Sequence, residues 1–306
     1  MMSSCTIHFP QRISNTAKFI NFILNLYKIF RDNEYSSIKL DFRDTVYFET
    51  NLLAVLSYFI EEFSSKGIRF RLIISAYLEK EQEVNTEDVI DSLFELYSED
   101  YSLALRPRKI GNRYPNESNR LLLDDLKMLN LKEYGKVKIL LSELFANLKM
   151  HTLYQEGVYA GFHNYKENTL VFSVVNYDIT IANQILRKRS IEFEDDFNAV
   201  VWALRKHNST RYHEEAGGLG LYLLRKYINH LEGRIIIISG KCYLEFDKSC
   251  YNESNENAIT IKKHISLVNR YEGTIITMII PDEWLEKSDE DKVIDYFDLK
   301  QLEEYR

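Results

Sequence analysis

The chain contains 306 residues, of which 45 % are hydrophobic and 28 % are charged, a composition typical of globular proteins. Asp and Glu outnumber Lys and Arg by 46 to 39, and the resulting formal net charge of −7 argues against a protein that coats nucleic acid or an anionic membrane. At ~150 residues per domain, this length predicts two domains.

The chain has three cysteines, Cys5, Cys242 and Cys250, and none of them has the spacing of a CxxC motif. They therefore predict neither a disulfide framework nor a zinc site. No apolar run approaches the ~18 residues of a transmembrane helix, and the first residues lack the basic and then apolar pattern of a secretory signal. We expect a cytoplasmic protein that does not enter a membrane.

Residues 1–78 alternate between helical and strand patterns, as in a small α/β domain. In chain order we expect a helix at 19–30, a strand at 38–42, a helix at 52–63 that Gly67 ends, and a strand at 70–74. Because a helix separates the two strands, they are predicted to be parallel, with a right-handed crossover.

Residues 79–120 have a different composition, acidic and partly helical in the first half and basic in the second, with Pro107 and Pro115. A basic segment can contact nucleic acid, but here no aromatic residues alternate with the basic ones. We therefore predict that 79–120 is a solvated connector between domains.

The alternating pattern resumes in residues 121–282. The expected elements are a helix at 138–150, paired strands at 157–165 and 169–177, a long irregular segment, a helix at 221–231, and strands at 234–239 and 274–280. Residues 283–306 follow as an acidic, helical tail with apolar anchors. We expect this tail to dock on a basic surface of this protein or of a partner.

Three polar residues in the helix predicted at 138–150 and just after it could carry chemistry. Glu143, Asn147 and His151 are spaced four residues apart, so they form one polar stripe on a helix. Such a stripe can supply a general base, an oxygen ligand for Mg²⁺ and a hydrogen-bond partner. A solvated helix face is the alternative.

A glycine cluster opens directly into the helix predicted at 221–231. Gly217, Gly218 and Gly220 would let backbone amides approach a phosphate, and the positive end of the helix dipole would favour the anion. The alternative is a tight turn with a helix cap.

In this order and spacing, these segments resemble the GHKL ATPases, the superfamily of DNA gyrase B and the histidine kinases. Glu143 and Asn147 match the N box of that family, which implies a base that activates water and a ligand for Mg²⁺. His151 matches the basic position that closes the box.

The resemblance extends to the phosphate and adenine segments. Gly217, Gly218 and Gly220 match the glycine box of the lid, and Thr274 matches the threonine that helps hold adenine. Residues 203–211 resemble the lid segment that precedes these glycines. By that resemblance, Thr210 and Arg211 would reach phosphate.

One box departs from the family pattern. Where the family has Asp-x-Gly-x-Gly, with the Asp accepting from the adenine amino group, this chain has Asn176, then Asp178 and Thr180 in place of the glycines. In a register shifted by two residues, Asp178 would read adenine, with Thr180 and Ala182 as small stand-ins. An asparagine can accept from adenine or donate to guanine O6, so weakened purine selectivity is expected.

The N-terminal part resembles a STAS domain, the fold of anti-sigma-factor antagonists, over residues 38–74. In the switch members of that family, a serine in the turn before the helix is phosphorylated. Here the turn reads Glu49-Thr-Asn-Leu, with Asn51 at the acceptor position. Phosphorylation at Asn51 is therefore not expected, and the neighbouring Thr50 is the residue to test.

Together these features predict an α/β protein with a STAS-like domain at 1–78, a GHKL (Bergerat-type) α/β sandwich at 121–282 and an acidic C-terminal helix. The expected function is ATP- and Mg²⁺-dependent regulation of a protein partner, as an ATPase or a serine/threonine kinase. The partner would bind through the STAS-like domain and the tail, and a homodimer is left open. The alternatives are a non-catalytic scaffold with a degenerate nucleotide pocket, and a component of a bacterial toxin–antitoxin or phage-defence system.

Overall fold

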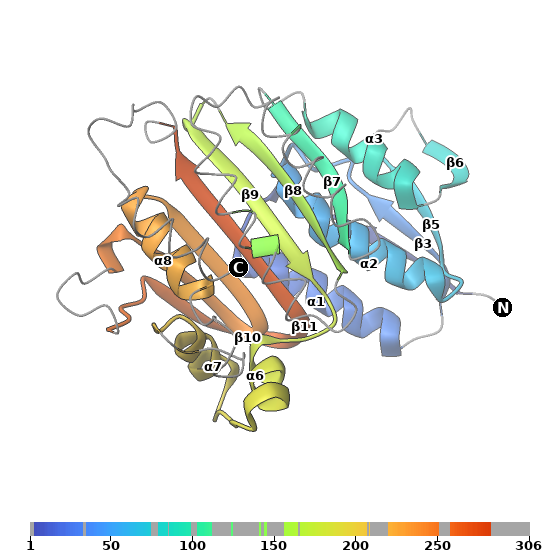
Figure 1. Ribbon diagram of the computed structural model, residues 1–306. Helices are drawn as coiled ribbons and strands as arrows, with labels where there is room; N and C mark the ends of the chain where they lie inside the picture. The colour runs from blue at the N-terminus through green and yellow to red at the C-terminus, as the bar shows by residue number, and fades with distance from the viewer. Residues whose placement is uncertain are drawn as a thin grey trace.

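The computed structural model describes residues 3–32, 35–74, 79–84, 86–98, 103–111, 124, 141, 144–145, 156–164, 166–206, 208, 220–250 and 258–282. These residues form a mixed α/β structure with two large sheets and a small two-stranded one. Figure 1 shows the larger sheet with helices on both of its faces.

The N-terminal sheet has the strand order β1-β3-β5-β6. Its first three strands run parallel and β6 is antiparallel to β5. The parallel pair and both helices predicted between residues 19 and 74 are thereby confirmed. The elements are β1 (Ser3–His8), β2 (Arg12–Ile13), α1 (Ala17–Asp32), β3 (Tyr35–Asp41), β4 (Tyr47–Phe48), the 3₁₀ helix η1 (Thr50–Leu52), α2 (Leu53–Ser65), β5 (Arg69–Ile73) and β6 (Glu79–Val84).

The second sheet is antiparallel throughout, in the order β10-β11-β9-β8-β7. The strand pair and the three later elements expected from the sequence are confirmed, although β10 and β11 are much longer than predicted. The elements are α3 (Thr86–Ser98), β7 (Leu103–Gly111), β8 (Glu156–Asn164), β9 (Thr169–Asn176), α6 (Ile181–Arg189), α7 (Asp196–Ala203), α8 (Gly220–His230), β10 (Arg234–Asp247), η2 (Lys248–Cys250) and β11 (Lys263–Pro281).

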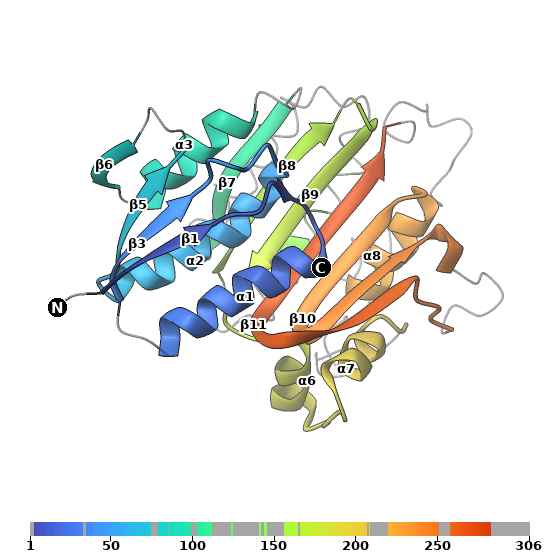
Figure 2. The same ribbon diagram turned by 180° about the vertical axis from the view of Figure 1, so that it is seen from behind.

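The two faces of the five-stranded sheet are covered by different parts of the chain. Side chains on alternate positions of a strand point to opposite faces. Val175 and Ile275 pack with α1 and α2, in a core that continues to the N-terminal sheet. Val174 and Ile276 belong to the second core, with α8. Figure 2 shows α1 and α2 between the two sheets, so the N-terminal sheet and the five-stranded sheet share a core.

Two stretches contain more secondary structure than predicted, although the acidic part of 79–120 was expected to be partly helical. Residues 79–120, expected to be a connector, supply β6 to one sheet, β7 to the other, and α3, which packs on α2. The irregular segment after β9 contains α6 and α7. Each of these two short helices begins at a capping side chain, Thr180 and Asp195 respectively.

The helix predicted at 138–150 is described at only three positions. Leu141, Leu144 and Phe145 are helical, and they are buried in the same core as α8. The acidic tail at 283–306 lies outside the described residues. All three cysteines are free thiols. Among the described helices, none combines the length and the apolar character that a membrane crossing requires.

Candidate functional site

The structure describes four of the residues that the sequence selected for nucleotide binding: Asn176, Asp178, Gly220 and Thr274. Gly220 is the first residue of α8, so the glycine cluster leads directly into this helix. The other selected residues lie outside the described part of the chain: Glu143, Asn147, His151, Thr210, Arg211, Gly217 and Gly218.

Asn176 and Thr274 are 98 residues apart in sequence and lie directly opposite each other in the β9–β11 pair. The backbone N–H of Thr274 donates to Oδ1 of Asn176 at 3.1 Å. By strand alternation both side chains project to the α8 face, since Val174 and Ile276 belong to the core on that face. The fold thus unites the two residues selected for purine recognition.

Ser239 on β10 extends this pair into a polar row across three neighbouring strands. Its Oγ lies 3.1 Å from Oγ1 of Thr274 and accepts from the backbone N–H of Ile181 at 2.8 Å. Because Ile181 is the first residue of α6, the row also holds the start of that helix. Ser239 was missed in the sequence, where its only signal is that it ends the apolar run of Ile235–Ile238.

The contact with Thr274 fixes the orientation of the Asn176 carboxamide. A backbone N–H can only donate, so the atom that it meets must be the carboxamide oxygen and not the nitrogen. Within the described residues, no acceptor is hydrogen-bonded to Nδ2 of this half-buried side chain. A ligand at this position would therefore meet an NH₂ donor.

The neighbouring Tyr177 connects this end of the sheet to α2. Its ring stacks on Tyr58, with 3.3 Å between centroids, and its hydroxyl donates to the backbone oxygen of Ala54 at 2.6 Å. Burial raises the pKa of Tyr177 well above its usual value, so the phenol stays protonated and can donate. Asp178 adds to the raised pKa of Tyr58, behind burial and Glu62. Of Asn176 and Asp178, the two candidates for reading adenine, it is Asn176 that accepts a hydrogen bond from the backbone N–H of Thr274.

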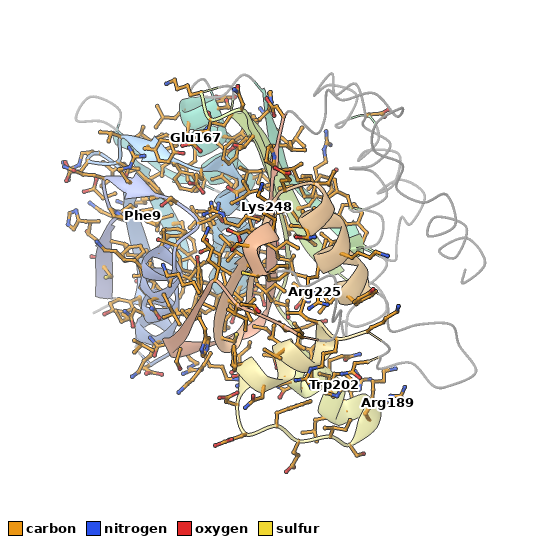
Figure 3. The ribbon with its side chains drawn as sticks, turned by 90° about the vertical axis from the view of Figure 1, so that its left-hand side faces the viewer. Phe9, Glu167, Arg189, Trp202, Arg225 and Lys248 are labelled. Atoms are coloured by element: carbon orange, nitrogen blue, oxygen red, sulfur yellow. The ribbon has the colours of Figure 1, made fainter. Side chains whose placement is uncertain are left out.

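Beyond the polar row, an ion pair anchors α7 to the hairpin of β10 and β11. Asp196, at the start of α7, accepts from Arg270 at 2.6 Å and from the backbone N–H of Lys241 at 2.9 Å. Arg270 also donates to Oγ1 of Thr180, which caps α6. A cavity of about 470 Å³ lies beside this cluster. Figure 3 shows α6 and α7, marked by Arg189 and Trp202, at the opposite end of the sheet from Glu167.

Gly240 is required where Asp196 approaches the backbone. Its φ is +61°, and a Cβ built on it would lie 2.2 Å from the carboxyl carbon of Asp196. Gly67 also has a positive φ, +85°, but a Cβ there would have nothing within 4 Å. A substitution at either glycine would strain the backbone, but only a substitution at Gly240 would also create a steric conflict.

We expect Gly240→Ala to lower the free energy of unfolding by about 3 kcal/mol, and Gly67→Ala by only about 1 kcal/mol, the strain of a left-handed alanine. Chemical denaturation of both variants measures this difference. Equal losses in the two variants would show that the carboxylate of Asp196 does not lie against Gly240.

A buried polar cluster joins the N-terminal unit to the other face of the sheet. Asn15 and Asn51 exchange side-chain hydrogen bonds at 3.1 and 3.2 Å. Asn51 also donates to Oγ of Ser173 on β9 at 2.6 Å, and Ser173 lies 2.6 Å from Oγ1 of Thr277 on β11. The turn that the sequence aligned with the STAS switch thus packs against the second sheet.

This packing affects whether Thr50, the residue to test for phosphorylation, is accessible to a kinase. Thr50 and Asn51 are both fully buried, and Oγ1 of Thr50 has no hydrogen-bond partner among the residues that the structure describes. A kinase cannot reach a buried hydroxyl, so phosphorylation of Thr50 would require the turn to leave the sheet.

Glu49, at the edge of the same cluster, has an unusual environment for a carboxylate. Burial raises its pKa above the ordinary value of 4.5, and hydrogen bonds from Asn15 to Oε2 only partly oppose this effect. The side chain lines a cavity of about 570 Å³ together with Tyr243 and the ion pair of Arg234 with Glu245.

Because the pKa of Glu49 is higher in the folded state than in the unfolded state, it stabilises the fold fully below its unfolded pKa. This contribution is lost as the pH rises through the folded value. We therefore expect wild type to lose more thermal stability than Glu49→Gln as the pH rises above 4.5. Melting curves at several pH values test this, and parallel pH profiles for the two proteins would contradict it.

No protein-family model matches the chain, and no curated protein matches it. Within the described ranges, no group of three or more His, Cys, Asp or Glu side chains could hold a metal ion. Asn147, to which the sequence assigned Mg²⁺, lies outside those ranges.

Proposed function

We propose that this protein binds a purine nucleoside triphosphate on the α8 face of its five-stranded sheet and, in response, regulates a protein partner. The observation that carries this proposal is the row formed by Asn176, Thr274 and Ser239. Among the described residues, the row supplies one NH₂ group without an acceptor, at the end of β9, and two buried hydroxyl groups, inside β11 and β10. Few polar groups among apolar walls are typical of a site that orients a nucleobase.

The phosphate end of the proposed site draws its support from α8. This helix begins at Gly220, and the N-terminus of a helix attracts anions through its unpaired N–H groups and its dipole. In a GHKL-type protein, Gly217, Gly218, Thr210 and Arg211 would hold the phosphates. Mg²⁺ on Asn147 would neutralise phosphate charge.

Glu143 is the proposed general base, which orients water in an ATPase or a protein hydroxyl in a kinase. This assignment is supported by Leu141, Leu144 and Phe145, which flank Glu143 in the sequence, are helical and belong to one core with α8. A STAS-like N-terminal unit, a GHKL-type C-terminal unit and a cytoplasmic location are parts of the same proposal.

The orientation of Asn176 adds a proposal about the base. Its oxygen is engaged by Thr274, so the base would meet the NH₂ group. Guanine presents an acceptor, O6, where adenine presents an amino group. We therefore expect GTP to bind at least as tightly as ATP, which departs from the ATP selectivity of the family that the sequence resembles.

A scaffold function is the second candidate, and one observation favours it. The oxygen that would accept from adenine is already bonded to the protein backbone. A protein that had lost nucleotide binding could keep Asn176 for this structural contact alone. In that case, a partner would bind without any nucleotide.

Thermal unfolding with and without Mg²⁺ and nucleotide distinguishes the two functions. A ligand at ~100 times its Kd stabilises a protein by ~2.7 kcal/mol, which raises the melting temperature by several degrees. We expect such a shift with millimolar GTP or ATP, and none with a pyrimidine triphosphate. Glu143→Ala should abolish turnover and retain the shift. No shift with either purine would exclude the binding proposal and leave the scaffold.

A further inference from the structure

Strand β1 forms one edge of the N-terminal sheet and is hydrogen-bonded on its other side to β3. Among the described residues, no strand lies along its outer side. The strand reads Ser-Ser-Cys-Thr-Ile-His and contains no Lys, Arg, Asp, Glu or Pro. Ser4, Thr6 and His8 are exposed. An open edge of this kind is a template for pairing with another strand.

The other edges of the two large sheets carry features that prevent such pairing. β6 has four charged residues among its six, and β7 contains Pro107 between Arg106 and Arg108. β10 contains charged residues and a register irregularity at Gly240. Charges, proline and bulges are the usual means by which proteins block their sheet edges. Of these four described edges, β1 alone contains neither Lys, Arg, Asp or Glu nor proline, and its register irregularity is confined to its first residues, Ser3 and Ser4.

The hydrogen bonds of β1 determine which of its residues face outward. The backbone N–H of Phe9, which follows the strand, donates to the backbone oxygen of Asp41, the last residue of β3. Backbone polar groups alternate between the two sides of a strand, so those of Cys5 and Ile7 also face β3. Those of Ser4, Thr6 and His8 therefore face the open edge.

We propose that two copies of this chain associate through β1, antiparallel, about a two-fold axis at Thr6. In this register Thr6 lies opposite Thr6 of the second copy, and Ser4 lies opposite His8. All the outward-facing residues then form hydrogen-bonded pairs, each donating and accepting once. The two four-stranded sheets become one continuous sheet of eight strands.

Because backbone groups of β1 face alternately inward and outward, only some positions of the two-fold axis allow hydrogen bonds between the two strands. An axis between Cys5 and Thr6 would place outward groups opposite inward ones, so no ladder could form. An axis at Cys5 is allowed, but it pairs only Ser4 with Thr6 and leaves His8 without a partner in the strand. The axis at Thr6 therefore gives the longest ladder. The strand carries no acidic or Lys/Arg charge, so two copies meet without repulsion between such charges.

A contact of two six-residue strands is smaller than a standard interface of ~1,200–2,000 Å², so we expect a reversible dimer with a Kd in the micromolar range. Light scattering after gel filtration, from 1 to 100 µM protein, should show the mass rising from monomer to dimer. Thr6→Pro should weaken dimerisation at least tenfold. The Thr6 N–H faces outward, so proline there removes no hydrogen bond to β3. Thr6→Val, which keeps this N–H, is the matched control.

Cysteine cross-linking tests the register. In a Cys5→Ser background, Thr6→Cys should form a disulfide dimer, because a hydrogen-bonded antiparallel pair has Cα atoms ~5.5 Å apart. Ser4→Cys in the same background should not, since its two copies would be ~13 Å apart. A wild-type protein that stays monomeric at 100 µM would overturn the proposal. So would a dimer that Thr6→Pro leaves unchanged, or a disulfide between wild-type Cys5 residues in place of the Thr6→Cys disulfide.

Discussion

Replacement of Asn51 by leucine is expected to lower the free energy of unfolding by about 3 kcal/mol. Leucine has nearly the same shape, but it removes the hydrogen bonds that Asn51 makes to Asn15 and Ser173. Asn15 keeps Glu49 and Thr277 as partners, and Ser173 keeps Thr277. The buried cluster between the N-terminal unit and the five-stranded sheet nevertheless loses three hydrogen bonds. Each lost bond costs about 1 kcal/mol, which gives the expected total.

The matched control is Asn198→Leu, the same exchange at an exposed position of α7. It should change the stability by less than about 0.5 kcal/mol. Because the two halves share a core, the wild type should unfold in one transition, and Asn51→Leu should shift that whole transition. Two separate transitions, with only the first one shifted, would show that the halves are independent domains.

Replacement of Asn176 by aspartate is expected to reverse the preference between the purines. One carboxylate oxygen can keep the hydrogen bond from the Thr274 N–H, and the other can accept from the amino group of adenine. The same oxygen would repel O6 of guanine. We expect affinity for ATP to rise about tenfold and affinity for GTP to fall about tenfold, each a difference of about 1.4 kcal/mol.

Titration calorimetry of wild type and variant with each nucleotide measures these changes. Asn183→Asp, on the exposed side of the nearby α6, adds the same charge without a contact to Thr274, and salt screens its effect. It should weaken both nucleotides slightly and equally. Equal effects of Asn176→Asp on ATP and GTP would contradict a role for Asn176 in reading the base.

The elements that could be predicted from the sequence are those with a clear hydrophobic period. The apolar spacing of α1 and the strand patterns of β8 and β9 identified these elements nearly to their ends. β1 was missed because its only strongly apolar residue is Ile7. β7 was missed because Pro107 and its basic neighbours are typical of a loop, yet such residues are also what an edge strand tolerates.

The contacts between distant segments could not be predicted in the same way. The apolar run of β9 indicates burial on both faces, but it does not say that α2 covers one of them. Asn176 and Thr274 were selected separately, and only the register of β9 and β11 brings them together. Ser239, Asp196 and Arg270 act through pairing across the β10–β11 hairpin, which leaves no local pattern in the sequence.

Photoaffinity labelling with an 8-azido purine triphosphate tests the central claim of a purine site at Asn176 and Thr274 most directly. After irradiation and proteolysis, we expect the label on peptides that contain residues 176–180 or 271–281, and excess unmodified GTP should remove it. Label confined to other peptides, or label that GTP does not displace, would contradict a purine site on this face of the sheet.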